Sequence, residues 1–318
     1  MVKVTIIIPV YNAESTLKKC LDSIKYQDYK DFEVLMVDDD STDSSAHIIE
    51  SYGYKLIKSS TNLGAGKARN LGAQKATTEL LAFTDSDCVL PKNWLSKIIK
   101  NFKNPNIQFV CGSYSGSAGN SFLEKYAFYE LLVRRKHRPK FVTSFPSNNF
   151  ACYRKIFLKE KGFPEFKNYV AEDLEFSLTM GKKYKIIWDK DLGIKHHFHN
   201  KTKKYLKQQY NFARDTMFLY LRKPYLKKIK TYQEDKNKFV IFYTGLAGLN
   251  IVGVFFYPPS IYFLPFLILI LILFDFNLIN YVHKKEGLLS STKSLGLILL
   301  RDISWVLGML KGLVRFFV

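Results

Sequence analysis

The sequence predicts an α/β domain built on a mostly parallel sheet, followed by a membrane-associated helical region. Three observations lead to this prediction. Strand-like and helix-like segments alternate through the first ninety residues, an uncharged run begins at Phe239, and a strong basic excess precedes that run. Alternating strands and helices favour a parallel sheet covered by helices, with ligands at the carboxyl ends of its strands.

The elements of the first domain follow from their apolar patterns. Val2–Val10 is rich in β-branched residues and apolar on both faces, so we expect a buried strand that ends near Pro9. The same reasoning gives the other elements. Expected strands cover 32–37, 55–59, 80–84 and 108–111, and expected helices cover 14–24, 44–52, 64–76, 93–102, 122–135 and 174–180, with a Gly/Ser-rich loop at 112–120.

The composition excludes a disordered chain and a disulfide-stapled peptide. Of 318 residues, 47% are hydrophobic and 15% aromatic, which is enough for a large packed core. The four cysteines have neither zinc-site nor disulfide-frame spacing, so we expect reduced thiols facing the cytoplasm. The apolar run at the N-terminus is too short for a signal peptide, and we expect it to start the folded domain.

The region from residue 239 onward has the composition of membrane helices. Residues 239–257 carry no charge, and a Pro-Pro pair separates them from a second apolar run at 260–279. Each run is close to the ~20 residues that cross a bilayer, and basic residues outside both runs place the two outer ends in the cytoplasm. We therefore expect a transmembrane hairpin; a buried hairpin in a soluble core is the alternative.

The last segment, residues 295–318, is expected to be an amphipathic helix. A helical wheel gives it a small, polar stripe opposite an apolar face that includes Trp305. The helix could lie in the membrane interface, or cross the membrane with its stripe against the hairpin. The stripe consists of Arg301, Ser304, Gly308, Lys311, Gly312 and Arg315.

Basic side chains are concentrated just before the apolar runs. Residues 182–238 hold 17 basic and 5 acidic side chains, within a net charge of +20 for the chain. This excess favours attraction to an anionic membrane surface. Nucleic-acid binding is the alternative, but no nucleic-acid motif accompanies the charge, so we expect no nucleic-acid partner.

Two acidic motifs directly follow predicted strands. In VDDDSTD, residues 37–43, helix capping would use Asp43 or Ser44 and leave Asp38 and Asp39 unexplained. In FTDSDC, residues 83–88, two carboxylates two positions apart could face one Mg²⁺ or Mn²⁺ ion. Such an ion would neutralise the charge on a departing diphosphate.

Two further motifs are candidates for chemistry. AEDLEF, residues 171–176, opens a helix, where its acids either stabilise the helix N-terminus or supply a general base. NLGAGKARN, residues 62–70, lacks the spacing and hydroxyl of a P-loop. Gly64 and Gly66 would still let the backbone approach a ligand, with Arg69 nearby for an anion.

Together, the order of the motifs resembles that of the family-2 inverting glycosyltransferases of the GT-A fold. The motifs are IIIPVYNAE, VDDDST, NLGAGKARNLG, FTDSDC, GFPEF and AEDLEFSLTMGKKYKI. The resemblance covers roughly residues 3–200 and implies a Rossmann-like nucleotide-diphospho-sugar transferase fold. Its nucleotide-sugar half would be residues 1–111 and its acceptor half 112–200, followed by a basic juxtamembrane segment at 201–238 and the membrane region at 239–318.

The resemblance also implies roles for individual residues. Asp39 would contact the nucleotide base, Asp85 would approach the ribose or the metal, and Asp87 would ligate the metal. Asp173 would be the general base, with Glu172 beside it. The residues implied in nucleotide-sugar binding are Pro9, Tyr11, Glu14, Asp39, Gly66, Arg69 and Asp85.

A histidine often completes the metal shell in this family. Of His137, His196, His197 and His199 we favour His196, with Mn²⁺ or Mg²⁺ as the ion; a basic, His-rich loop that faces lipid phosphates is the alternative. The chain departs from the family pattern at Asp40, where glycine is common and a larger residue could strain the turn. Thr179 replaces a residue that is often basic, and the Gln-x-x-Arg-Trp signature of processive enzymes is absent.

These features predict a metal-dependent glycosyltransferase at the cell membrane, multi-pass, with a cytoplasmic catalytic domain. It would move a sugar from a nucleotide-diphosphate sugar, by default a UDP-sugar, to a hydroxyl of a lipid-linked saccharide in envelope polysaccharide or glycan assembly. A polyprenyl phosphate is already ionised and gains little from a base, so the Glu172-Asp173 pair favours a hydroxyl acceptor. The alternatives are a polyprenyl-phosphate sugar synthase, a non-catalytic membrane scaffold and a nucleotidyltransferase.

Overall fold

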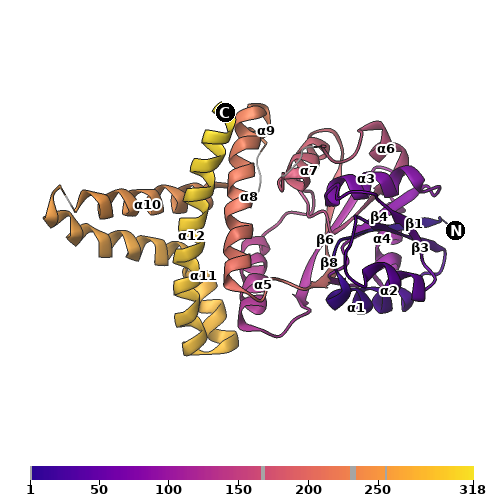
Figure 1. Ribbon diagram of the computed structural model, residues 1–318, viewed down its shortest axis with the longest axis horizontal. Helices are drawn as coiled ribbons and strands as arrows, with labels where there is room; N and C mark the ends of the chain where they lie inside the picture. Colours follow the sequence, from indigo (N-terminus) through magenta and orange to yellow (C-terminus); the bar gives the residue numbers. More distant parts are fainter. Residues whose placement is uncertain (1, 166–168, 230–233, 255) are drawn as a thin grey trace. The chain divides into compact units, whose positions relative to one another are not determined.

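The chain forms two compact units in the computed structural model, which describes residues 2–165, 169–229, 234–254 and 256–318 (Figure 1). The first unit comprises Met1–Gly119 and Arg138–His197, and the second comprises Asn120–His137 and Phe198–Val318. Three predicted features include positions outside the described residues. They are the last residue of the GFPEF motif, part of the basic segment at 230–233, and residue 255 of the first apolar run.

A mixed sheet forms the centre of the first unit. Among the described residues it has eight strands in the order β3-β2-β1-β4-β7-β6-β8-β5. The pairs β1–β2, β1–β4, β2–β3 and β6–β8 are parallel, and the other three pairs are antiparallel. The strands are β1 (Val4–Val10), β2 (Phe32–Asp38), β3 (Lys55–Lys58), β4 (Leu80–Thr84), β5 (Cys88–Val89), β6 (Phe109–Ser117), β7 (Asn149–Tyr153) and β8 (Ile186–His196).

Helices bury apolar residues on both faces of this sheet. On one face, α1, α2 and α4 pack against side chains such as Ile6 and Ile8 of β1. On the other face, α3, α6 and α7 pack around Ile7 and a group of phenylalanines, in which Phe83 stacks on Phe150 at 4.4 Å between ring centroids. These helices are α1 (Glu14–Lys25), α2 (Ser45–Ser51), α3 (Ala65–Lys75), α4 (Trp94–Phe102), α6 (Arg154–Lys159) and α7 (Glu172–Lys183).

The sheet extends further than the sequence predicts. The prediction of a loop at 112–120 is wrong for its first part, because β6 continues to Ser117 and pairs in parallel with β8. Gly112 permits this pairing, since a Cβ atom added there would lie 1.9 Å from the carbonyl oxygen of Leu192. Strands β7 and β8 were not predicted, because their pairing partners lie far away in the sequence.

The second unit is helical among its described residues. In Figure 1, α8 and α12 run side by side, and α10 and α11 form a hairpin that extends away from them. One helical stretch, Pro258–Glu286, is long and apolar enough to cross a membrane, whereas the apolar helix Phe239–Gly253 is shorter, so the predicted two-span hairpin is not confirmed. The elements are α5 (Phe122–Arg135), α8 (Thr202–Arg222), α9 (Pro224–Lys227), α10 (Glu234–Gly253), the 3₁₀ helix η1 (Pro258–Phe263), α11 (Leu264–Glu286) and α12 (Leu288–Phe317).

Part of the small, polar stripe of α12 packs against α8. A Cβ atom at Gly308 would lie 2.3 Å from the carbonyl oxygen of Tyr210, and one at Gly312 would lie 2.2 Å from that of Arg214. The two glycines therefore allow close contact between the helices. The expectation that Trp305 lies on the face opposite the stripe is wrong. Its side chain is buried, and its indole N–H donates to Gln209 of α8, the helix that Gly308 and Gly312 also contact, at 3.0 Å.

Helix α5 lies in the second unit, although the predicted boundary placed it in the catalytic domain. Its buried Glu130 accepts hydrogen bonds from Arg301 at 2.6 Å and from the hydroxyl of Tyr205 at 2.9 Å. A buried carboxylate needs such partners. The position of α5 thus follows from contacts with residues that are far away in the sequence.

Candidate active site

The centre of the candidate site is the turn that follows β4. Asp85 is the first residue after the strand, and its carbonyl accepts the Cys88 N–H at 3.0 Å, which closes the turn. Cys88 then pairs with His196 at the end of β8. The turn and the end of β8 therefore bring Asp85, Asp87 and His196 together, as the sequence predicts for a site at a strand end.

Asp87 and His196 form the part of the site that best suits a metal ion. Their Oδ1 and Nε2 atoms lie 3.3 Å apart, and the possible ligand atoms of Asp87, Cys88 and His196 lie within 4.8 Å of one another. Partial burial raises the pKa of Asp87, but the adjacent His196 and the hydrogen bond from Cys88 together outweigh this, so the pKa is lowered overall. The carboxylate and the imidazole are ligands that suit Mn²⁺.

Cys88 belongs to the same cluster, although the sequence did not suggest it as a ligand. Burial and the nearby carboxylates of Asp87 and Asp85 raise the pKa of its thiol well above the ordinary value. The Sγ atom lies 3.7 Å from Asp87 Oδ1 and donates to it. Hard ions such as Mg²⁺ and Mn²⁺ prefer oxygen ligands to thiolates, so Asp87 is a stronger candidate ligand than Cys88.

Arg69 links the turn to the start of α7. Its guanidinium donates to Asp85 at 2.5 Å and lies 3.8 Å from the carboxylate of Glu172. The side chain is almost completely buried and lies over the ring of Phe163, 5.3 Å from its centroid. Its Nε atom is buried without a hydrogen-bond partner among the described residues. The cluster therefore contains a buried guanidinium whose Nε–H could donate one further hydrogen bond.

Glu172 turns towards the first turn of α3. A Cβ atom at Gly66 would lie 2.6 Å from its carboxylate, so a larger residue there would displace the Glu172 side chain from this position. Burial raises the pKa of Glu172 to about 7, because Arg69 and the Gly66 N–H offset the cost of burying the charge only in part. Asp173, the predicted base, lies beside it and accepts the N–H of Leu174 at 2.7 Å.

Asp39 holds the loop that precedes α3. Its two carboxylate oxygens accept the N–H groups of Leu63 at 2.7 Å and Gly64 at 2.8 Å. The following residue, Asp40, has φ = 68°, which is strained for a residue with a side chain, as its position in the motif led us to expect. The acidic motif thus fixes the loop beside Gly66, and base contact by Asp39 stays a prediction.

The other predicted nucleotide-site residues lie where β1 ends and α1 begins. Pro9 is buried in β1, and Tyr11 is exposed just after the strand. Glu14 accepts the Ser44 N–H at 3.2 Å, and its own N–H donates to Asp43 at 3.1 Å. These bonds join α1 to the loop after β2.

The sequence analysis missed Tyr114. Its ring centroid lies 5.6 Å from that of His196, and its hydroxyl donates to Asn148 at 3.0 Å. The residue escaped notice because GSYSGSAGN has the composition of a loop, whereas Tyr114 lies in β6. The signal in the sequence was that Tyr114 is a large aromatic residue in a run of glycine, serine and other small residues.

Comparisons with known proteins agree on the class of the first unit. Residues 5–162 match the model of glycosyl transferase family 2. An Escherichia coli protein named UDP-Glc:alpha-D-GlcNAc-diphosphoundecaprenol beta-1,3-glucosyltransferase WfgD is 36% identical over 136 residues, which cover 42% of this chain and 54% of WfgD. Glycosyltransferase GlyA of Streptococcus pneumoniae is 34% identical over 116 residues, 35% of this chain and 17% of GlyA.

Two solved structures share the fold. The mannosyltransferase PcManGT from Pyrobaculum calidifontis, in complex with GDP-Man and Mn²⁺, has a TM-score of 0.58 and 18% identity, with 99% of this chain and 86% of that one covered. The structure of residues 1–349 of TarS from Staphylococcus aureus has a TM-score of 0.50 and 22% identity, with 68% of this chain and 65% of that one covered. At these identities the likeness concerns the fold alone. The matched parts span only 54% and 17% of the two sequence relatives.

Proposed function

Because residues 5–162 of this chain belong to glycosyl transferase family 2, we propose that the chain transfers a sugar from a nucleotide-diphosphate sugar to a hydroxyl of a lipid-linked saccharide, with inversion. One observation carries the proposal. The Asp87–His196 pair and the Asp85–Arg69–Glu172 cluster lie around one turn at the carboxyl end of β4. Carboxylates, an imidazole and a guanidinium at a strand end suit a diphosphate and its metal ion.

We take a UDP-sugar and a polyprenyl-diphosphate-linked saccharide as the donor and acceptor to test first. The Escherichia coli relative is named for this kind of pair. Asp87 and His196 would hold Mn²⁺ or Mg²⁺, with Asp85 beside them. When bound, the ion would neutralise charge on the departing nucleoside diphosphate.

The two acids at the start of α7 would have different tasks. Glu172 is committed to Gly66 and Arg69, so it would position the guanidinium. Asp173 would accept the proton of the acceptor hydroxyl as its oxygen attacks the anomeric carbon. The bond from that carbon to the diphosphate breaks, and the configuration inverts. A positioned base of this kind contributes about 10²–10⁴-fold.

Membrane association would come from the second unit. An 18-residue window within the Pro258–Glu286 stretch has a mean hydropathy of 2.3, and the segment 182–238 before the apolar helices is strongly basic. Such a segment is attracted to the anionic cytoplasmic leaflet. The first unit would then face the cytoplasm at the cell membrane.

Nucleoside diphosphate release tests the proposal. Detergent-solubilised protein is incubated with a panel of nucleotide sugars, with and without Mn²⁺ and a bacterial lipid extract. We expect release from one donor, only with the extract, and a product with inverted anomeric configuration. Asp87→Ala and Asp173→Asn should each lower release at least about 100-fold.

An exposed carboxylate on β8 provides the control. Asp191→Asn removes one acid from the same unit without touching the cluster and should leave release unchanged. Equal release from wild type and Asp87→Ala would overturn the metal-dependent mechanism. No release from any donor by folded protein would favour a binding scaffold.

A further inference from the structure

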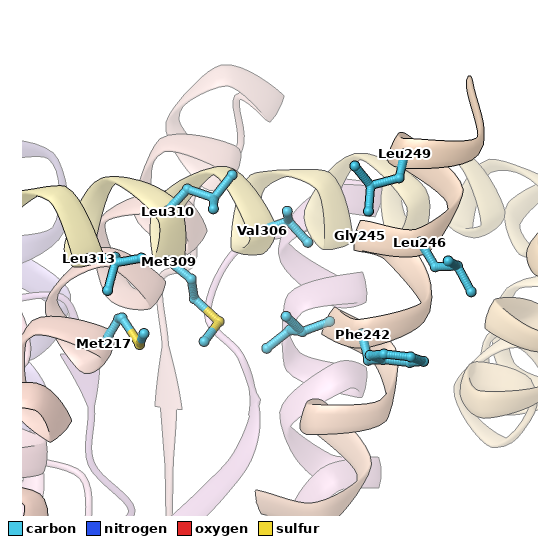
Figure 2. A pocket seen from close by; sticks show the side chains of 10 residues that line it. Met217, Phe242, Gly245, Leu246, Leu249, Val306, Met309, Leu310 and Leu313 are labelled. Carbon is cyan, nitrogen blue, oxygen red and sulfur yellow. The ribbon is translucent and has the colours of Figure 1, made fainter. Parts of the chain in front are cut away.

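An apolar groove crosses the second unit between α10, α12 and the C-terminal half of α8 (Figure 2). Its volume is about 380 Å³, within the range of about 300–1,000 Å³ usual for ligand sites. Leu313 and Met217 lie at one end and Leu249 at the other in Figure 2. The lining residues are Met217, Ile241, Phe242, Gly245, Leu246, Leu249, Val306, Met309, Leu310 and Leu313.

The lining suits a hydrocarbon chain. It consists of aliphatic, aromatic and thioether side chains, and Met217 and Met309 can adapt to a flexible ligand. Gly245 widens the wall formed by α10, since a Cβ atom added there meets no atom within 4 Å. A saccharide or a peptide backbone would find no hydrogen-bond partners on these side chains.

One end of the groove has a basic surrounding. Met217 lies one turn after Arg214, and Leu313 lies between Lys311 and Arg315. Arg214 and Arg315 both donate to Asp215, at 2.7 and 2.8 Å. The residues that follow Met217 along α8 and α9 include Arg222, Lys223 and Lys227. An anionic headgroup is therefore favoured at the Met217 end of the groove.

We propose that this groove binds the isoprenoid chain of the polyprenyl-diphosphate-linked acceptor, with the lipid diphosphate at the basic end near Arg214 and Arg315. The combination of an apolar channel and a basic end matches a ligand with one long hydrocarbon chain and an anionic head. This inference rests on the proposed function, because it names how the lipid-linked acceptor is held. The groove orients the lipid, and the transfer chemistry belongs to the first unit.

Photolabelling of the full chain tests the assignment. The probe is geranylgeranyl phosphate with a diazirine on its chain, added to protein in detergent and mapped by mass spectrometry. We expect labels on the peptides that contain Met217 and Met309. Unlabelled polyprenyl phosphate should compete, and phosphatidylglycerol at the same concentration should not.

Two glycines of α10 provide a matched pair of variants. Gly245 lines the groove, whereas Gly248 does not, and an added Cβ meets no atom within 4 Å at either position. Gly245→Phe should lower labelling about tenfold, the effect of losing about 1.4 kcal/mol of binding. Gly248→Phe should label like the wild type. Equal labelling of both variants would overturn the proposal, as would competition by phosphatidylglycerol, which indicates a bilayer-lipid site.

Nucleoside diphosphate release separates this inference from the proposed function. If labelling behaves as expected and no donor is turned over, the groove binds the lipid and the proposed function is wrong. If turnover occurs and both variants label alike, the function stands and the groove assignment fails.

Discussion

Two buried arginines, one in each unit, have opposite surroundings. Arg69 of the first unit contacts Asp85 and Glu172, whose side chains are 26% and 18% exposed. Arg301 of the second unit contacts Glu130, Asp275 and Asp302, each at 2.6 Å, and these are 5%, 6% and 0% exposed. One cluster is open to solvent on one side, whereas the other is sealed.

The difference indicates two uses of the same ionic chemistry. In the sealed cluster, Arg301 joins α5, α11 and α12, and any helix that moved away would leave a buried charge without its partner. In the open cluster, Arg69 retains a buried Nε atom without a partner among the described residues, and Glu172 can exchange a proton. We therefore expect the sealed cluster to determine stability and the open cluster to determine activity.

Arg301→Met should have the largest effect. It removes the cation that three buried carboxylates share and leaves Glu130 with Arg134 alone, which costs about 3–5 kcal/mol. We expect a large fall in the thermal midpoint, measured by scanning fluorimetry in detergent. Arg301→Lys keeps the positive charge without the planar guanidinium, so its thermal midpoint should fall less than that of Arg301→Met. Lys293→Met, at an exposed position of the same helix, is the control, and a similar loss there would refute the sealed-cluster explanation.

Arg69→Met should reduce activity more than stability. We expect nucleoside diphosphate release to fall about 100-fold, because the cation beside the donor diphosphate is lost. The thermal midpoint should fall less than for Arg301→Met, since Asp85 and Glu172 reach solvent and Glu172 can take up a proton. A midpoint loss as large as that of Arg301→Met would remove the distinction between the clusters.

Gly312→Leu tests whether close helix packing supports the sealed cluster. The new side chain would meet the backbone of Arg214, and overpacking of this kind costs about 1–3 kcal/mol. Gly296→Leu on the same helix is the matched control, because a Cβ atom there meets no atom within 4 Å. Urea midpoints of the two variants should differ; equal midpoints would mean that α8 and α12 do not depend on this contact.

The pH dependence of stability should report on Glu172. Its pKa of about 7 lies above the value of 4.5 expected in the unfolded chain. Between these values the folded state holds a proton that the unfolded state has lost, so stability falls as the pH rises from 4.5 to 7. Glu172→Gln should remove this fall, which amounts to at most about 3 kcal/mol at about 1.4 kcal/mol per pKa unit; thermal midpoints in EDTA measure it. An unchanged pH profile would contradict the raised pKa.

The sequence predicted several local elements of both units well. Helix α5 and strand β4 have the predicted bounds, because their apolar patterns and end residues are local signals. Asp85, Asp87 and His196 were also predicted as neighbours, from strand ends and from the resemblance. Tyr114 and Cys88 were not, because their place beside the site depends on the pairing of β6 with β8 and of β5 with β8.

For the second unit, the periodicity predicted the amphipathic stripe of α12 but not the helix against which it packs. Periodicity within one segment determines which residues share a face, because it depends on local geometry alone. Which surface covers that face depends on matching charges and shapes far away in the chain, such as Glu130 for Arg301 and Tyr210 for Gly308. The same physical reason applies to Glu172. The sequence identifies it as an acidic residue, but its raised pKa and its contact with Gly66 arise only in the folded structure.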